Sequence, residues 1–144
     1  MRRRAIDLLA RREHGITELT RKLIQKGLPD DLVHDAINQL SDDGLISDFR
    51  YCESMVNYQY QRGQGPQKIR YKLRSDGISD EVIENTFESL SPDWESSLIH
   101  LFKKKYSDRA ARTPSERAKQ VRFLSSRGFP QEMIYRLLKE RKSS

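Results

Sequence analysis

The sequence predicts an all-α protein of three tandem three-helix repeats, each resembling a helix-turn-helix, that form an elongated, curved stack. Two observations predict this fold. One helical phrase occurs three times, at residues 21–33, 71–83 and 122–134, with its glycines 50 and 51 residues apart. Self-similarity at a fixed period is the signature of a repeat architecture. In addition, no window alternates apolar and polar residues as a half-buried strand does.

Each copy of the phrase predicts a helix, a tight turn and a second helix. A leucine lies four residues before the glycine, an apolar residue directly after it, and two more lie five and six residues on. Glycine adopts the left-handed conformation that ends a helix without a Cβ penalty. The expected helix-ending residues are Gly27, Gly77 and Gly128, and the residues suited to the first positions of the next helices are Pro29, Ser79 and Pro130.

A third helix fits upstream of each pair, at residues 3–13, 48–61 and 92–106. We expect the last of these to open with Ser91 as its cap and Pro92 as its first helical residue. The predicted repeats are residues 1–44, 45–91 and 92–144. Each is too small to bury a large core alone.

The stretch Arg62-Gly63-Gln64-Gly65-Pro66 predicts a turn between two helices. It lacks the Gly-Lys-Ser/Thr ending of a phosphate-binding loop. Gly65 would be the N-cap and Pro66 the first helical residue, with Ile69 and Leu73 on the buried face. The alternative is that the glycine pair lets the backbone approach a partner closely.

Two apolar stripes are predicted to form part of the core, because their members recur every three or four residues along a helix. The stripes are Phe49, Cys52, Val56 and Tyr60, and Trp94, Leu98, Ile99 and Phe102. Cys52 is the single cysteine, which excludes an internal disulfide and a cysteine-based zinc cluster. We expect it to be a buried or half-buried thiol.

The net charge of +6 arises in the last third of the chain. Residues 1–44 hold 8 basic and 8 acidic groups, residues 45–91 hold 6 and 7, and residues 92–144 hold 13 and 6. Basic patches attract nucleic acid or an acidic protein surface, although they also coat the solvent face of ordinary helices. No apolar run is long enough to span a membrane, and no secretory signal is evident. We therefore expect a soluble, cytoplasmic protein without membrane contacts.

A catalytic function is not indicated. The three histidines His14, His34 and His100 are isolated from one another and from any recognisable nucleophile. The acidic pairs lie at predicted helix ends, where the helix dipole accounts for them. We expect no enzyme activity, no metal and no cofactor.

The stretch Gly44-Leu45-Ile46-Ser47-Asp48-Phe49-Arg50-Tyr51 resembles the signature of the RecX regulators of the bacterial recombinase RecA. It leads into the turn at residues 62–66 and then to Ile69, Leu73, Gly77 and Ile78, spaced as in that family. The opening Leu8-Leu9-Ala10-Arg11-Arg12-Glu13-His14 is also similar to the family's first helix. The resemblance covers nearly the whole chain and is strongest from Gly44 to Ile78.

This resemblance implies a non-enzymatic modulator that binds RecA and lies in the groove of the RecA–DNA filament. It would limit filament growth, ATP hydrolysis and strand exchange, with weak direct DNA binding possible and the chain itself a monomer. The residues expected to contact the filament or its DNA are Arg62, Lys68, Arg70, Lys72, Arg74, Lys103, Lys104, Lys105, Lys119, Arg122 and Arg127.

The alternative is a stand-alone DNA-binding protein, since each repeat resembles a helix-turn-helix and the net charge is positive. Against it, the helices after Gly27 and Gly77 open with acidic residues, which would face phosphates unfavourably. The helix that starts at Pro130 is less acidic and keeps this alternative open.

Overall fold

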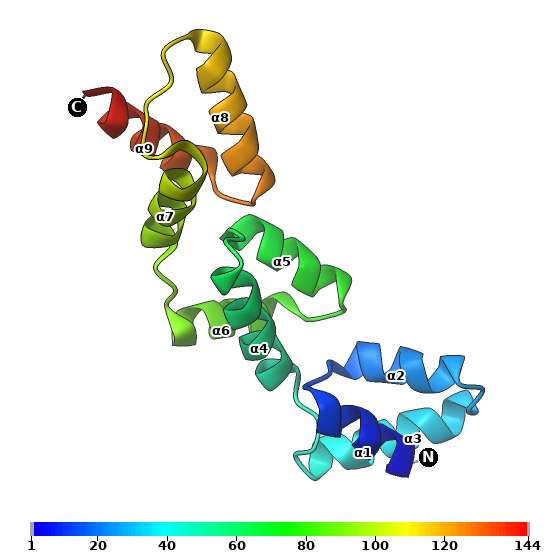
Figure 1. Cartoon of the computed structure of the whole chain (residues 1–144). Coiled ribbons are helices and arrows are strands. Elements are labelled where there is room, and N and C mark those ends of the chain that lie inside the picture. Colours follow the sequence, from blue (N-terminus) through cyan, green and yellow to red (C-terminus); the bar gives the residue numbers. More distant parts are fainter. Residues whose placement is uncertain (1, 144) are drawn as a thin grey trace. The chain divides into compact units, whose positions relative to one another are not determined.

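The computed structural model describes residues 2–143, and within that range the chain forms nine α-helices and no strand (Figure 1). The helices are α1 (Arg2–Arg11), α2 (Ile16–Gln25), α3 (Asp30–Asp42), α4 (Asp48–Gln61), α5 (Pro66–Ser75), α6 (Asp80–Leu90), α7 (Trp94–Tyr106), α8 (Pro114–Ser126) and α9 (Gln131–Ser143). We refer to α1–α3, α4–α6 and α7–α9 as repeats 1, 2 and 3. The all-α, three-repeat prediction is confirmed. No helix within this range is long and apolar enough to cross a membrane.

The chain packs into two compact units. Unit 1 combines Met1–Val56 with Lys72–Leu90, and unit 2 combines Asn57–Tyr71 with Ser91–Ser144. Helices α4 and α5 therefore contribute to both units. Each unit holds a contact between the middle helix of one repeat and the glycine turn of the next.

The repeated phrase forms the helix ends that its glycines predict. Gly27, Gly77 and Gly128 have φ angles of +86°, +83° and +97°. The residue after the glycine donates its backbone N–H to the carbonyl of the leucine in the phrase, from Leu28 to Leu23 at 3.4 Å. The equivalent bond from Ile78 reaches Leu73 at 3.0 Å. This pattern satisfies carbonyls that a helix end otherwise leaves unpaired.

The same phrase supplies core residues to each repeat. Its leucines Leu23, Leu73 and Leu124 are all fully buried. In repeat 1, Leu23 joins a cluster with Leu19 and Leu40, among others. Repeat 3 has a corresponding cluster of α7, α8 and α9 side chains around Phe102 and Phe129.

The predicted turn at residues 62–66 is confirmed. Gly65 precedes α5, which begins at Pro66, and both Ile69 and Leu73 are buried. Cys52 and Val56 are fully buried, as are Leu98 and Phe102 in the second stripe.

Three sequence-based details are wrong. Ser91 does not cap α7, because its φ of +43° turns the chain first and the Asp93 carboxylate accepts the Ser96 N–H at 3.0 Å instead. Phe49 is 38% exposed rather than part of the core. Asp42 and Asp43 lie at the C-terminal end of α3, where the dipole does not favour acids; Asp43 instead pairs with Arg2 at 2.8 Å.

In unit 2 the start of α5 lies directly against the glycine turn of repeat 3. The Gly65 N–H donates to the Arg127 carbonyl at 2.6 Å and the Gln67 N–H donates to the Gly128 carbonyl at 3.0 Å. A Cβ at Gly65 would lie 2.5 Å from the Gly128 carbonyl carbon, and a Cβ at Gly128 would lie 2.4 Å from the Lys68 Cβ. Two glycines are therefore required for this contact, which we call the interlock.

Unit 1 contains the corresponding interlock between repeats 1 and 2. A Cβ at Gly77 would lie 2.5 Å from the Thr17 hydroxyl at the start of α2. Asp48 of α4 accepts the Ile16 N–H at 2.8 Å, and the Tyr51 hydroxyl donates to Asp76 at 2.6 Å. In Sequence analysis, the glycine pair that includes Gly65 could allow the backbone to approach a partner closely. In the structure, Gly65 makes its close approach to Gly128 of the next repeat.

His14 is the buried polar residue next to the unit 1 interlock, with 1% of its surface exposed. Its Nδ1 lies 3.0 Å from the Arg12 carbonyl and its Nε2 lies 3.0 Å from the Lys22 ammonium. The tautomer that satisfies both contacts has Nδ1 donating and Nε2 accepting. Burial, together with the charges of Arg12 and Lys22, lowers the pKa of His14 below 6.5.

We expect Gly65→Ala to destabilise the protein by about 1–3 kcal/mol, because the added methyl group collides with backbone that has no room to move. Gly15→Ala is the matched control, since Gly15 precedes α2 as Gly65 precedes α5 and its Cβ would make only ordinary contacts at 3.4 Å or longer. Urea unfolding measures both. Equal stabilities of the two variants would contradict the requirement for glycine at position 65.

We expect the free energy of unfolding to decrease on acidification because of His14. A histidine whose folded-state pKa is lowered contributes its full stability above the unfolded-state value of 6.5, and that stability is lost as the pH falls from there through the folded-state pKa. Urea unfolding at about pH 8 and about pH 5 measures the change. His14→Gln keeps a donor and an acceptor but cannot titrate, so its stability should change less over this interval; an identical change would exclude His14 as the cause.

Candidate partner-binding surface

A basic hollow of about 150 Å³ lies in unit 2 between the end of α4 and the middle of α7. Its polar lining includes Arg62, Ser97, His100 and Lys104. Gly63, with a φ of +79°, ends α4 and lets the chain turn beside Leu101 of α7. No acidic residue lines the hollow, so it suits an anionic group.

Aromatic contacts hold the end of α4 against α7. The rings of Tyr60 and Trp94 meet edge to face with their centroids 5.5 Å apart, and the Tyr60 hydroxyl donates to the Asp93 carbonyl at 3.2 Å. Tyr60 and Trp94 are thus partly buried packing residues, as the stripes predicted. Their contact fixes the distance between the two walls of the hollow.

The guanidinium of Arg62 is positioned by Tyr58, one helical turn earlier. It lies 5.2 Å from the centre of the tyrosine ring and donates to the tyrosine hydroxyl at 2.6 Å. Tyr58 is itself 54% exposed. A cation held on an exposed ring is ordered before a partner arrives, which lowers the entropy lost on binding.

A second basic and aromatic cluster surrounds Phe123 of α8. The Lys105 ammonium lies 5.2 Å and the Arg127 guanidinium 5.0 Å from the centre of its ring. Tyr106 supports the ring edge to face at 5.9 Å, and burial raises the pKa of its hydroxyl. Arg127 also carries the carbonyl that accepts the Gly65 N–H, so the interlock holds its backbone while the Phe123 ring contacts its guanidinium.

The predicted binding residues divide between the two units. In unit 2, Arg62 and Lys104 line the hollow, and Lys105 and Arg127 flank Phe123. The remaining unit 2 residues are Lys68 and Arg70 on α5, Lys103 on α7, and Lys119 and Arg122 on α8. Among these five, Arg70 is half-buried and the others are exposed.

Lys72 and Arg74 belong to unit 1 and already form ion pairs there. Lys72 lies 2.9 Å from Asp76, and Arg74 lies 2.7 Å from Asp80. Asp76 is the carboxylate that accepts the Tyr51 hydroxyl, and this contact together with burial raises the pKa of Tyr51. Lys72 therefore stabilises a contact between α4 and the glycine turn of repeat 2.

His100, Tyr58 and Phe123 were not among the residues predicted to bind. Each lies four positions before a residue that was predicted to bind, so helical spacing places the two side by side. The pairs are His100 with Lys104, Tyr58 with Arg62, and Phe123 with Arg127. A search for basic residues paired with aromatic residues or histidine one turn away would have found all three. Within residues 2–143, no group of three or more His, Cys, Asp or Glu side chains could hold a metal ion.

The fold and this surface define an all-helical repeat protein with exposed basic and aromatic side chains. Three family models match in order, described as the first, second and third three-helix domains of RecX, at residues 2–40, 47–86 and 93–138. The regulatory protein RecX of Pseudomonas entomophila is 44% identical over 141 residues, which cover 98% of this chain and 91% of that protein. The regulatory protein RecX of Pseudomonas savastanoi pv. phaseolicola is 45% identical with the same coverage.

Solved structures agree with the helical arrangement. The crystal structure of RecX from Lactobacillus salivarius matches with a TM-score of 0.81 and 25% identity, covering 99% of this chain and 95% of that one. A second crystal structure of a regulatory protein RecX matches in fold with a TM-score of 0.77, over 96% of this chain and 70% of that one. The chain belongs to the RecX family of regulatory proteins.

We expect Lys72→Glu to lower the free energy of unfolding by about 0.5–1 kcal/mol, because the ion pair becomes a like-charge pair one turn apart. Lys119→Glu is the control, since Lys119 is exposed in the middle of α8 and its reversal should change stability by less than about 0.5 kcal/mol. Urea unfolding distinguishes the two. Equal, small effects would show that the contact with Asp76 contributes nothing.

Proposed function

We propose that this protein is a non-enzymatic, monomeric regulator that acts in the cytoplasm by binding RecA and the RecA–DNA filament. It inhibits filament growth, ATP hydrolysis and strand exchange. The observation that carries this proposal is membership of the RecX family along nearly the whole chain, combined with the basic surface of unit 2. The family resemblance supplies RecA as the partner.

The chemistry of the surface supports a partner that presents phosphates or carboxylates. Arg62 and Lys104 line one hollow without an acidic neighbour, and Lys105 and Arg127 flank one aromatic ring. Guanidinium and ammonium groups bind DNA phosphates and acidic protein side chains alike. A RecA–DNA filament offers both, and simultaneous contacts with two of its subunits would increase the apparent affinity through effective concentration.

The same surface suits a regulator that acts by binding. Arg62 rests on Tyr58 and Arg127 rests on Phe123, so both cations already have a ring contact in the free protein. A preordered surface loses little conformational entropy when it meets a polymer. Direct contact with DNA would follow from the same cations and would weaken with salt.

We expect the wild-type protein to inhibit ATP hydrolysis by preformed filaments of bacterial RecA on single-stranded DNA at well below one molecule per RecA subunit. The double variant Arg62→Glu with Lys104→Glu should raise the concentration for half-inhibition about tenfold or more, because two attractive contacts become repulsive. A steady-state hydrolysis assay at fixed salt measures both proteins.

The matched control is Arg21→Glu with Lys26→Glu, which makes the same change of charge at exposed positions in repeat 1. It should inhibit as the wild type does. Inhibition that is unaffected by the Arg62 and Lys104 reversals would exclude the hollow as the contact. A wild-type protein that binds DNA but does not inhibit RecA even in excess would instead be a stand-alone DNA-binding protein.

A further inference from the structure

The interlock uses the same two parts in both units. One part is the first turn of a repeat's middle helix, α2 or α5, and the other is the glycine turn of the following repeat. The residue after that glycine also lies close to the preceding repeat: a Cβ at Gly65 would lie 2.7 Å from the Phe129 backbone nitrogen, and a Cβ at Gly15 would lie 3.5 Å from the Ile78 Cδ1. The start of a middle helix is therefore a protein-docking surface in this fold.

Repeat 3 offers the same surface at the start of α8. Thr113 and Pro114 take the places of Gly65 and Pro66, with Thr113 capping the helix by accepting the Glu116 N–H at 3.1 Å. A cavity of about 180 Å³ lies beside this helix start among residues 2–142.

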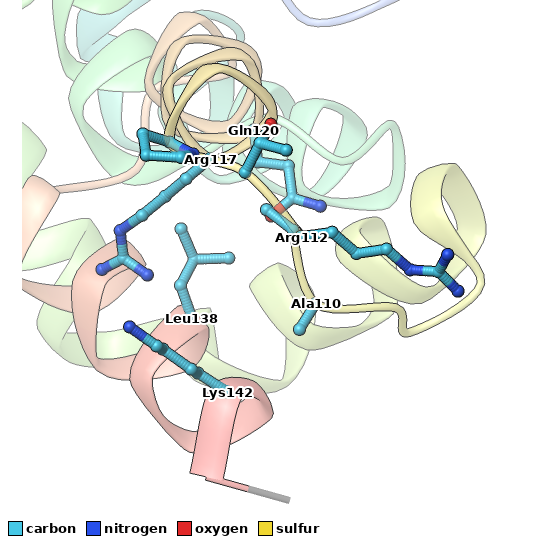
Figure 2. Close-up of a pocket in the computed structure, with 9 residues that line it drawn as sticks. Ala110, Arg112, Arg117, Gln120, Leu138 and Lys142 are labelled. Carbon is cyan, nitrogen blue, oxygen red and sulfur yellow. The ribbon is translucent and has the colours of Figure 1, made fainter.

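The cavity combines an apolar floor with a basic rim (Figure 2). Leu138 lies in its centre, and the ends of the Arg117 and Lys142 side chains lie together on one side of that leucine. Arg112 extends on the other side, and no acidic residue among the described ones lines the cavity. An occupant that matches it carries an apolar side chain next to a negative charge.

The side-chain oxygen of Gln120 gives independent evidence that a hydrogen-bond donor is missing at this cavity. The residue is 5% exposed, and its Nε2 donates to the Arg109 carbonyl at 3.2 Å. Its Oε1 is buried and accepts no hydrogen bond from the described part of the chain. A buried acceptor left unpaired costs about 1–3 kcal/mol, so a ligand that supplies an N–H donor at this wall of the cavity gains affinity.

These features favour a peptide over nucleic acid. A phosphate would suit Arg117 and Lys142, but a base would have to supply the donor for Gln120, and the described lining residues include no aromatic ring on which that base could stack. The cavity is also smaller than the roughly 300 Å³ at which small-molecule pockets begin. A peptide supplies a backbone N–H, an apolar side chain and a carboxylate within two or three residues.

We propose that this cavity binds a segment of an acidic partner protein. An apolar side chain of the segment packs on Leu138, a backbone N–H donates to the Gln120 Oε1, and a neighbouring carboxylate pairs with Arg117 and Lys142. The cavity is lined by none of the residues assigned above to RecA or DNA, so this peptide site is additional to the proposed function.

The test is titration of the ¹⁵N-labelled full chain with a capped pentapeptide, Gly-Leu-Asp-Glu-Asp, followed by NMR. We expect the largest shifts at the Gln120 side-chain amide and at backbone amides near the start of α8. Arg117→Glu with Lys142→Glu should weaken binding at least tenfold, because attraction becomes repulsion. Replacing the peptide's leucine by serine should weaken binding as well.

Two further variants separate the cavity from general charge effects. Ala110→Phe fills the cavity without a change of charge and should abolish binding even if the charge reversals disturb the fold. Arg136→Glu, an exposed reversal on α9 that does not line the cavity, should bind as the wild type does. Shifts spread over other surfaces, or full binding by Ala110→Phe, would overturn the proposal, as would displacement of the peptide shifts by a thymidine oligonucleotide that binds the same amides more tightly.

Discussion

The close approach at the interlocks is the constraint on which the rest of the structure depends. In unit 2, Gly65 and Gly128 bring a helix start and a helix end so close that the helix start donates two backbone hydrogen bonds directly to the glycine turn, at 2.6 and 3.0 Å. Thin repeats have little apolar surface to bury against one another, so a close and directional contact contributes stability that packing alone would not provide. Glycine is thus needed twice at Gly77 and Gly128, for the positive φ that ends a helix and for the missing Cβ that lets the preceding repeat approach.

Two residues of the basic surface, Arg127 and Lys68, also take part in the unit 2 interlock. Arg127 uses its carbonyl in the interlock and its guanidinium on the ring of Phe123, so one residue links the backbone contact to the exposed surface. Lys68 has its stem against Gly128 while its side chain remains exposed. Binding residues that also take part in the scaffold keep their geometry without a partner, which suits a protein that recognises an extended polymer.

Sequence reasoning succeeded where a single residue type has one physical use. Three glycines at the same place in a repeated phrase predicted three helix ends, and the Gly-Pro step at Gly65 predicted the start of α5. Sequence reasoning was less successful where a residue type can serve two different structural roles. Phe49 has the spacing of a core residue but is exposed, and Lys72 has the charge of a binding residue but neutralises Asp76. The exposure of Phe49 is not visible before the helices pack, whereas the Lys72–Asp76 pair, one helical turn apart, follows from helical spacing.

The sequence by itself determined the helices, their ends, the three-repeat order and the basic character of the last third, because these follow from local conformational preference and composition. Only the tertiary structure decided which cations are free to bind, which are paired within the chain, and that an unfilled cavity adjoins α8. The reason is that ion pairs such as Arg74–Asp80, ring contacts such as Tyr60–Trp94 and the unpaired oxygen of Gln120 depend on distances of a few ångströms between segments. Repeat spacing predicts which segments are neighbours but not how their side chains meet.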